Sequence, residues 1–220
     1  PYETLPIVQH KAVLACKKAG KPVIIATHML ESMISSPMPT RAEITDVSNA
    51  VVEQADCVML SGETTIGKYP VECVDVLNRI IKSMEGLDGP KYNTELVLKN
   101  PKAAMLRSAV TLANEIPDCG ILAFTRSGYI TNTLSALRPR HTPIFGFSEK
   151  DNIFKAMLLQ WGVEPFLMKF NQDDPEETIT RAIALLLKRE WISLGQNIVI
   201  VTNLHAKERI CDTIQIRVVE

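Results

Sequence analysis

Two short apolar segments, each followed by polar residues and then by a helical pattern, most constrain how this chain can fold. The first runs from Val23 to Thr27 and the second from Asp56 to Ser61. A strand that is apolar throughout is typical of a parallel sheet covered on both faces. Parallel neighbours also need a long crossover, usually a helix, between them. We therefore expect an α/β fold in which these two strands are parallel neighbours.

Helical patterns surround these strands. Three helices are predicted, over residues 5–18, 40–54 and 70–86. The second begins with Thr40-Arg-Ala-Glu43, the spacing of a capping box in which the threonine and glutamate side chains satisfy each other's backbone amides. The third begins with Pro70, whose missing N–H costs nothing in the first turn of a helix.

The same alternation resumes after a short break. Residues 86–93 hold two glycines and a proline between helical patterns, so we place a domain boundary here and expect domains over 1–86 and 87–220. Five more strands are predicted, over 119–124, 143–147, 163–168, 197–202 and 213–219. The last two are too close for a helical crossover, so we expect a mostly parallel sheet with an antiparallel last strand.

The composition excludes several classes of function. The net charge of −1 gives no global attraction to nucleic acid or to an anionic membrane. No apolar run approaches the roughly 20 residues that a membrane helix needs, and the N-terminus lacks the pattern of a signal peptide. The five cysteines form no CxxC pair, so we expect buried, reduced thiols in a cytoplasmic protein. The four histidines lack the spacing of a zinc site.

The residues that leave the first two strands could carry chemistry. Thr27 and His28 follow the first strand, and Ser61, Gly62 and Glu63 follow the second. In an α/β barrel the loops after the strands share the face that holds the active site. Thr27 could position a ligand or only satisfy a backbone carbonyl, and His28 could be a base or a plain loop residue. Ser61 and Glu63 could line the mouth of a pocket.

Two predicted helices begin with an arginine close to their N-terminus, where the helix dipole disfavours a cation. We expect Arg41 to bind a partner's carbonyl or carboxylate. The loop Thr125-Arg126-Ser127-Gly128 combines free amides, two hydroxyls and a cation at a helix start, which favours an anion. Phosphate is the ligand that we favour, and the alternative is a Ser or Thr cap without a ligand.

Together these residues resemble pyruvate kinase. The segments ATHMLESM, PTRAEITDV and MLSGETTIGKYPVE follow in the family's order and close to its spacing, and LAFTRSG, LRPR, PIFGFS and NIVIVT extend a weaker likeness over essentially the whole chain. The resemblance implies the last two strands of a (β/α)8 barrel with their helices, followed by a C-terminal α/β regulatory domain. It also implies a cytoplasmic, homotetrameric enzyme of glycolysis that makes pyruvate and ATP from phosphoenolpyruvate and ADP.

The resemblance assigns roles in the barrel residue by residue. Thr27 matches the threonine that contacts the substrate carboxylate and helps to deliver a proton to the enolate. Ser61 and Glu63 match the turn at the edge of that site, where the serine joins a proton-relay water network. Arg41 matches an arginine at the contact between barrel domains of neighbouring subunits. His28 stands where the family usually has glutamine or asparagine, so its role is open.

In the second domain, the resemblance implies that Thr125, Arg126, Ser127 and Gly128 grip the phosphate of an effector. Tyr129 and Ile130 replace further polar donors of members that respond to sugar bisphosphates, and Thr131 is expected to compensate. The final turn, predicted over residues 202–210, lacks the glycine-rich effector loop of those members. We therefore expect a sugar monophosphate or nucleotide effector, or none.

The family's cofactors are Mg²⁺ and K⁺, and their ligands belong to segments N-terminal to Pro1, as does the catalytic lysine. Phosphoryl transfer depends on such metal and cation clamps. We therefore expect no metal site here, and an incomplete piece that is inactive by itself. Two alternatives remain open: a non-catalytic regulatory module that binds a phosphorylated metabolite, and a different phosphate-handling barrel enzyme.

Overall fold

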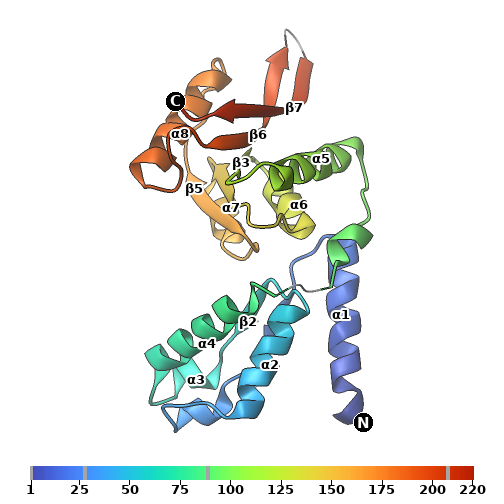
Figure 1. Ribbon diagram of the computed structural model, residues 1–220, viewed down its shortest axis with the longest axis vertical. Coiled ribbons are helices and arrows are strands. Elements are labelled where there is room, and N and C mark those ends of the chain that lie inside the picture. Colours follow the sequence, from blue (N-terminus) through green and yellow to red (C-terminus); the bar gives the residue numbers. More distant parts are fainter. Residues whose placement is uncertain (1, 27–28, 88–89, 207–208) are drawn as a thin grey trace. The chain divides into compact units, whose positions relative to one another are not determined.

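The computed structural model describes residues 2–26, 29–87, 90–206 and 209–220. The chain divides into two compact units, Pro1–Glu95 and Leu96–Glu220, each of which is described by itself (Figure 1). In the part of the chain that the structure describes, no helix is long and apolar enough to cross a membrane.

The first unit contains two short parallel strands, as predicted. In the pairing of β1 (Ile24–Ala26) with β2 (Cys57–Met59), Ile24 lies opposite Cys57 and Ala26 lies opposite Met59. The helices of this unit are η1 (Tyr2–Thr4), α1 (Leu5–Ala19), η2 (Glu31–Ile34), α2 (Arg41–Val52), α3 (Gly62–Thr65), α4 (Pro70–Met84) and η3 (Tyr92–Glu95). Because the strands are parallel and in register, the chain leaves both of them at one edge.

Local signals set the ends of these helices. Helix α1 ends at Gly20, whose φ of 66° is left-handed and whose N–H bonds to the carbonyls of Cys16 and Lys17. The predicted capping box at Thr40 and Glu43 is present at the start of α2. Packing then joins the elements through a small apolar core made of Met29, Leu30, Met33, Val47, Cys73, Val76 and Leu77.

A buried ion pair holds α1 against the start of β2. Lys17 Nζ lies 2.6 Å from Asp56 Oδ2, and the two side chains are only 3% and 4% exposed. The same carboxylate oxygen accepts the amide N–H of Val23 at 2.7 Å. The two donors stabilise the buried carboxylate of Asp56. Removing the charge of either Lys17 or Asp56 would leave the other charge buried without its ion-pair partner, which is strongly destabilising.

The first unit extends further than the sequence indicated. The boundary was expected after Gly86 because of the glycines and proline that follow, whereas the structure divides the chain after Glu95. Tyr92 is buried, and its hydroxyl lies 3.1 Å from His10 Nδ1 on α1. Lys18 and Glu95 form an ion pair at 2.8 Å. These side-chain contacts, which composition does not reveal, attach residues 92–95 to the first unit.

The second unit is built on one five-stranded sheet in the order β5-β4-β3-β6-β7. Its strands are β3 (Gly120–Phe124), β4 (Ile144–Ser148), β5 (Val163–Leu167), β6 (Asn197–Ala206) and β7 (Arg209–Val218). The first four are parallel to one another, and β7 is antiparallel to β6, as predicted. These two strands form a longer hairpin than expected, since 203–206 and 209–212 belong to strands rather than to a turn.

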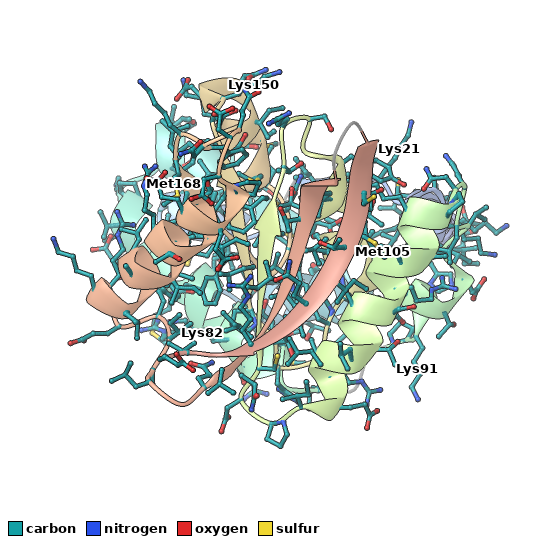
Figure 2. All side chains as sticks on the ribbon, turned by 90° about the horizontal axis from the view of Figure 1, so that it is seen from above. Lys21, Lys82, Lys91, Met105, Lys150 and Met168 are labelled. Atoms are coloured by element: carbon teal, nitrogen blue, oxygen red, sulfur yellow. The ribbon has the colours of Figure 1, made fainter. Side chains whose placement is uncertain are left out.

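Helices cover both faces of this sheet. Helices α5 (Pro101–Glu115) and α6 (Tyr129–Leu137) pack on one face through a core that includes Leu106, Val110 and Leu134. Helix α8 (Pro175–Lys188) packs on the other through Ile179 and Leu186, with Phe145 and Phe147 of the sheet. Helix α7 (Asp151–Met157) follows β4. Lysines such as Lys91 and Lys150 are exposed (Figure 2).

The cysteines differ in part from the expectation that all are buried. All five are free thiols, as predicted. Cys73 and Cys119 are buried and Cys16 and Cys57 are half-buried, but Cys211 is exposed on the edge strand β7. Strand β7 has only one neighbour in the sheet, so one side of it faces away from the core.

Candidate functional site

The two strand exits of the first unit lie at a common edge, as the sequence predicted. The pair Ala26–Met59 is the last in the β1–β2 ladder, so the residues that follow both strands begin next to each other. Thr27 and His28 lie outside the described residues, and their predicted roles stay predictions. Ser61, two residues after Met59, is exposed and precedes α3.

Glu63 is not at a pocket mouth, where the sequence analysis placed it. Its side chain is 3% exposed. Oε1 accepts the amide N–H of Leu30 at 3.2 Å, and Oε2 accepts the amide N–H of Ser61 at 2.8 Å. The carboxylate therefore lies inside the unit, between the turn that follows β1 and the turn that follows β2.

A second carboxylate, that of Glu43, holds the other part of the loop after β1. It completes the capping box by accepting the Thr40 amide at 2.7 Å, and it also accepts the Ser32 amide at 2.7 Å and the Ser32 hydroxyl at 2.6 Å. Burial raises the pKa of Glu43, but the hydrogen bonds from Ser32 and Thr40 outweigh burial and hold this pKa below its ordinary value. No local pattern indicated the contact with Ser32, which is 11 residues away in the chain.

Arg41 is exposed at the first position of α2 and forms no ion pair with any residue that the structure describes. Its predicted place at a subunit contact stays a prediction.

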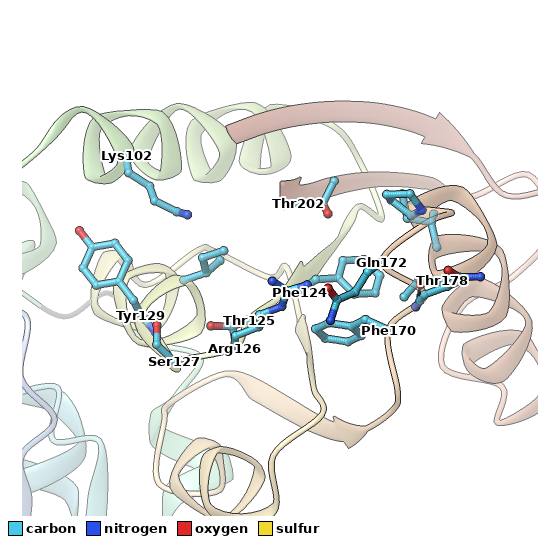
Figure 3. Close-up of a pocket in the computed structure, with 14 residues that line it drawn as sticks. Lys102, Phe124, Thr125, Arg126, Ser127, Tyr129, Phe170, Gln172, Thr178 and Thr202 are labelled. Atoms are coloured by element: carbon cyan, nitrogen blue, oxygen red, sulfur yellow. Dashed lines mark hydrogen bonds between the residues drawn. The ribbon is translucent and has the colours of Figure 1, made fainter. Parts of the chain in front are cut away.

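The second unit contains a cavity of about 380 Å³ beside the loop that was predicted to bind phosphate (Figure 3). Thr125, Arg126 and Ser127 line it, as the sequence suggested, but Gly128 and Thr131 do not. The remaining lining residues come from distant parts of the chain: Lys102, Phe124, Tyr129, Ile130, Phe170, Asn171, Gln172, Pro175, Thr178, Ile179 and Thr202. No local pattern could have identified them, because the fold alone brings them together.

Within the loop, the hydroxyl groups largely serve the loop's own backbone. Thr125 Oγ1 accepts the Gly128 amide at 3.0 Å, and Ser127 Oγ accepts the Tyr129 amide at 3.4 Å. Thr131 is buried and donates to the Gly128 carbonyl at 3.2 Å, so it does not reach the cavity. Gly128 has a φ of 80°, a left-handed conformation that glycine adopts at little cost. These bonds stabilise the turn itself, whereas the N-cap of α6 is Gly128, which has no side-chain cap, and they do not engage the side chain of Arg126.

Two cations line the cavity, and each one has a carboxylate partner outside the lining. Lys102 Nζ on α5 lies 2.8 Å from Asp212 Oδ1 on β7. Arg126 Nε lies 3.9 Å from Glu149 Oε2, a looser contact, with the arginine side chain 53% exposed. Lys102 lies on the side of the cavity near Tyr129, whereas Phe170, Gln172 and Thr178 lie on the other side (Figure 3). Glu149, the partner of Arg126, also accepts the Phe170 amide at 2.8 Å, so the cavity offers one cation near its aromatic wall and a second at Lys102.

The described residues do not fit a metal site. Across 2–26, 29–87, 90–206 and 209–220, no three His, Cys, Asp or Glu side chains come together as a group that could hold an ion. The carboxylate of Glu63, between the two strand exits, accepts two backbone amides. We therefore derive no catalytic step through a metal bound to these residues.

Comparison with known proteins gives concordant matches. The family model for the barrel domain of pyruvate kinase matches residues 1–74, and the model for its alpha/beta domain matches 103–217. Plastidial pyruvate kinase 2 of Arabidopsis thaliana is 39% identical over 205 residues, a match that covers 91% of this chain and 35% of the relative. Pyruvate kinase of Methylorubrum extorquens is 32% identical over 209 residues, covering 93% of this chain and 43% of the relative.

A solved structure agrees with these matches. The crystal structure of a pyruvate kinase from Cryptosporidium parvum aligns with a TM-score of 0.90 and 31% sequence identity, covering all of this chain and 44% of that one. This chain thus spans less than half the length of these three relatives.

Proposed function

Because this chain belongs to the pyruvate kinase family, we propose that it is part of an enzyme that transfers the phosphoryl group of phosphoenolpyruvate to ADP, giving pyruvate and ATP. The observation that supports this most directly is the parallel pairing of β1 and β2, whose ladder ends at Ala26 and Met59, so that both strands end at one edge. Loops at the carboxyl ends of barrel strands are where such folds place their chemistry.

The reaction has two steps, and this chain would contribute to the second. After the phosphoryl group has left, the enolate must take up a proton. We assign Thr27 to the substrate carboxylate and to proton delivery, and Ser61 to the hydrogen-bonded water network beside it. The exposed position of Ser61 is compatible with contact to a ligand or water.

The first step needs groups that the described residues lack. In the whole enzyme, Mg²⁺ and K⁺ would neutralise charge on the moving phosphoryl group. We propose that their ligands and the catalytic lysine lie in upstream barrel strands of a longer protein, since this chain spans only 35% of plastidial pyruvate kinase 2.

The chain alone should therefore form no ATP from phosphoenolpyruvate and ADP in the presence of Mg²⁺ and K⁺. The full-length protein should turn over under the same conditions. A coupled assay for pyruvate measures both, with the product ATP quantified separately. ATP formed by the 220-residue chain alone would show that the phosphoryl-transfer step does not need groups outside this chain. An inactive, folded full-length protein would contradict the proposed activity.

A second candidate function concerns the cavity in the second unit. It would bind a phosphorylated metabolite, either as the allosteric effector site of the enzyme or as a non-catalytic module. What supports it is the pair of lining cations, Arg126 and Lys102, in a cavity within the usual size range of small-molecule sites. Cations in the wall favour a phosphate-bearing ligand, and we propose a sugar monophosphate or a nucleotide.

Thermal unfolding of the chain with glucose 6-phosphate, AMP, fructose 1,6-bisphosphate or inorganic phosphate tests this pocket. A ligand at 100 times its Kd should stabilise the folded chain by about 2.7 kcal/mol. Arg126→Ala should abolish the shift, while Arg79→Ala, which removes an exposed arginine of α4, should retain it. A ligand shift that survives Arg126→Ala would refute the anion site.

Assembly and location are proposed from the family alone. The whole enzyme would be a homotetramer in which Arg41 lies at a contact between barrel domains. A cytoplasmic location is proposed from the free cysteines, although several relatives carry plastidial or chloroplastic names. Light scattering of the full-length protein with and without Arg41→Glu would test the assembly.

A further inference from the structure

One buried carboxylate connects the two turns that leave the paired strands. Glu63 Oε1 accepts the amide of Leu30, 33 residues earlier in the chain, at 3.2 Å. Its Oε2 accepts the amide of Ser61 at 2.8 Å. With one oxygen on each turn, the carboxylate fixes the turn after β1 relative to the turn after β2.

The peptide of Ser61 is held from its other side as well. The Ser61 carbonyl accepts the amides of Thr64 at 3.3 Å and Thr65 at 3.2 Å, together with the Thr65 hydroxyl at 3.0 Å. The Ser61 hydroxyl bonds to no residue in the described part of the chain. The backbone of Ser61 is therefore fixed, while the residue itself is exposed.

The backbone of Glu63, like that of Ser61, is held by close contacts. A Cβ atom at Gly67 would lie 2.3 Å from the Glu63 carbonyl oxygen, so only glycine fits there. The Cys73 thiol donates to the same oxygen at 3.8 Å. The glutamate thus has little freedom to move toward a ligand.

We infer that Glu63 is a positioning residue for the proton-transfer step, which holds the turns after β1 and β2 in one geometry and does not itself carry the proton. This inference rests on the proposed pyruvate kinase activity. It replaces the direct catalytic role that the resemblance suggested for this residue with an indirect one.

The chemistry of the step explains why the carboxylate is a poor proton carrier here. The methylene carbon of the enolate forms a new C–H bond as its C–O⁻ becomes C=O, and the proton comes from a hydroxyl or water that solvent replenishes. Both oxygens of Glu63 accept a backbone amide, from Leu30 and from Ser61, and the residue is only 3% exposed. A carboxylate held in these bonds and out of contact with solvent is poorly placed to give a proton to the enolate and to regain one from water.

Two variants of the full-length enzyme test this role. Glu63→Gln keeps the shape of the side chain but sets an NH₂ group against one amide, and Glu63→Asp keeps the charge but shortens the reach. Glu72→Gln, on the exposed first turn of α4, is the matched control. Two rates are measured on each preparation: formation of ATP, and exchange of the methyl hydrogens of pyruvate for deuterium, which is the proton-transfer step in reverse.

A misplaced turn should slow the proton transfer most. We expect Glu63→Gln to lower the exchange rate by about 10- to 100-fold, as ångström-scale misplacement does, with a smaller loss in Glu63→Asp. The ratio of exchange to ATP formation should fall, while the pH profile of exchange keeps the apparent pKa values of the wild type. Both rates fall in proportion to the fraction of folded enzyme, so their ratio still measures the effect on proton transfer when a variant is partly unfolded.

Three outcomes separate the possibilities. If one limb of the pH profile disappears in Glu63→Gln, the carboxylate carries the proton and the inference is wrong. If Glu63→Gln matches Glu72→Gln in both rates, Glu63 does not position the step. If the wild-type enzyme forms no ATP and exchanges no hydrogen, the proposed function fails instead.

Discussion

The strand exits of the first unit and the cavity of the second use charged side chains in opposite ways. In the first unit, the carboxylates of Glu43 and Glu63 are buried and bound to backbone amides. In the second, Lys102 and Arg126 line a cavity and have carboxylate partners that lie outside its wall. A charge bound to the backbone fixes geometry, whereas a partly exposed ion pair can exchange its partner for a ligand.

The largest expected difference between the two units concerns their ion pairs. Lys17→Met should destabilise the first unit by about 3–5 kcal/mol, because it leaves the buried Asp56 carboxylate without its charged partner. Lys102→Met, which breaks the more exposed pair with Asp212, should cost about 0–1 kcal/mol. Urea unfolding of the full-length protein, followed by hydrogen exchange in each unit, measures both. Equal effects of the two substitutions would show that the buried pair contributes no more to stability than the exposed one.

Next in size is a pH effect at Glu43. Its pKa is lower in the folded state than the ordinary value of 4.5, so the stability that it contributes is present above pH 4.5. That stability is lost as the pH falls through the folded-state value. Glu43→Gln should therefore cost about 1–3 kcal/mol at pH 7 and much less at low pH, measured by urea unfolding at each pH. A loss that does not change with pH would show that shape, not charge, matters at this position.

The smallest expected effect is a gain in affinity. Asp212→Asn should free Lys102 to bind an anion and raise the affinity of the cavity for inorganic phosphate by about 2- to 5-fold. In free energy this gain is about the size of one exposed ion pair. Calorimetric titration measures this change. Asp151→Asn, which breaks an exposed pair with Lys155 on α7, is the control and should have no effect. If adding Lys102→Met to Asp212→Asn leaves the gain intact, Lys102 is not the group that was freed.

Local features were predictable because they depend on neighbours in the sequence. The capping box at Thr40 needs only residues three positions apart, and the parallel β1–β2 pair follows from two apolar strands with a helix between them. The turn over residues 125–127 beside the cavity was located for the same reason, since a strand, a turn and a helix start follow directly in the chain. Thr131, on α6, does not line the cavity because its hydroxyl turns to the Gly128 carbonyl, a choice that only packing determines.

The sequence alone determined the order of strands and helices, the family and the segments that carry polar residues at the strand ends, since these depend on short-range patterns. The tertiary structure decided that Glu63 joins two turns, that residues up to Glu95 belong to the first unit, and that Lys102 and Phe170 share a cavity with Arg126. Each of these depends on contacts between residues far apart in the chain. Such contacts form only when the apolar faces of the helices and strands are buried together, so no local pattern records them.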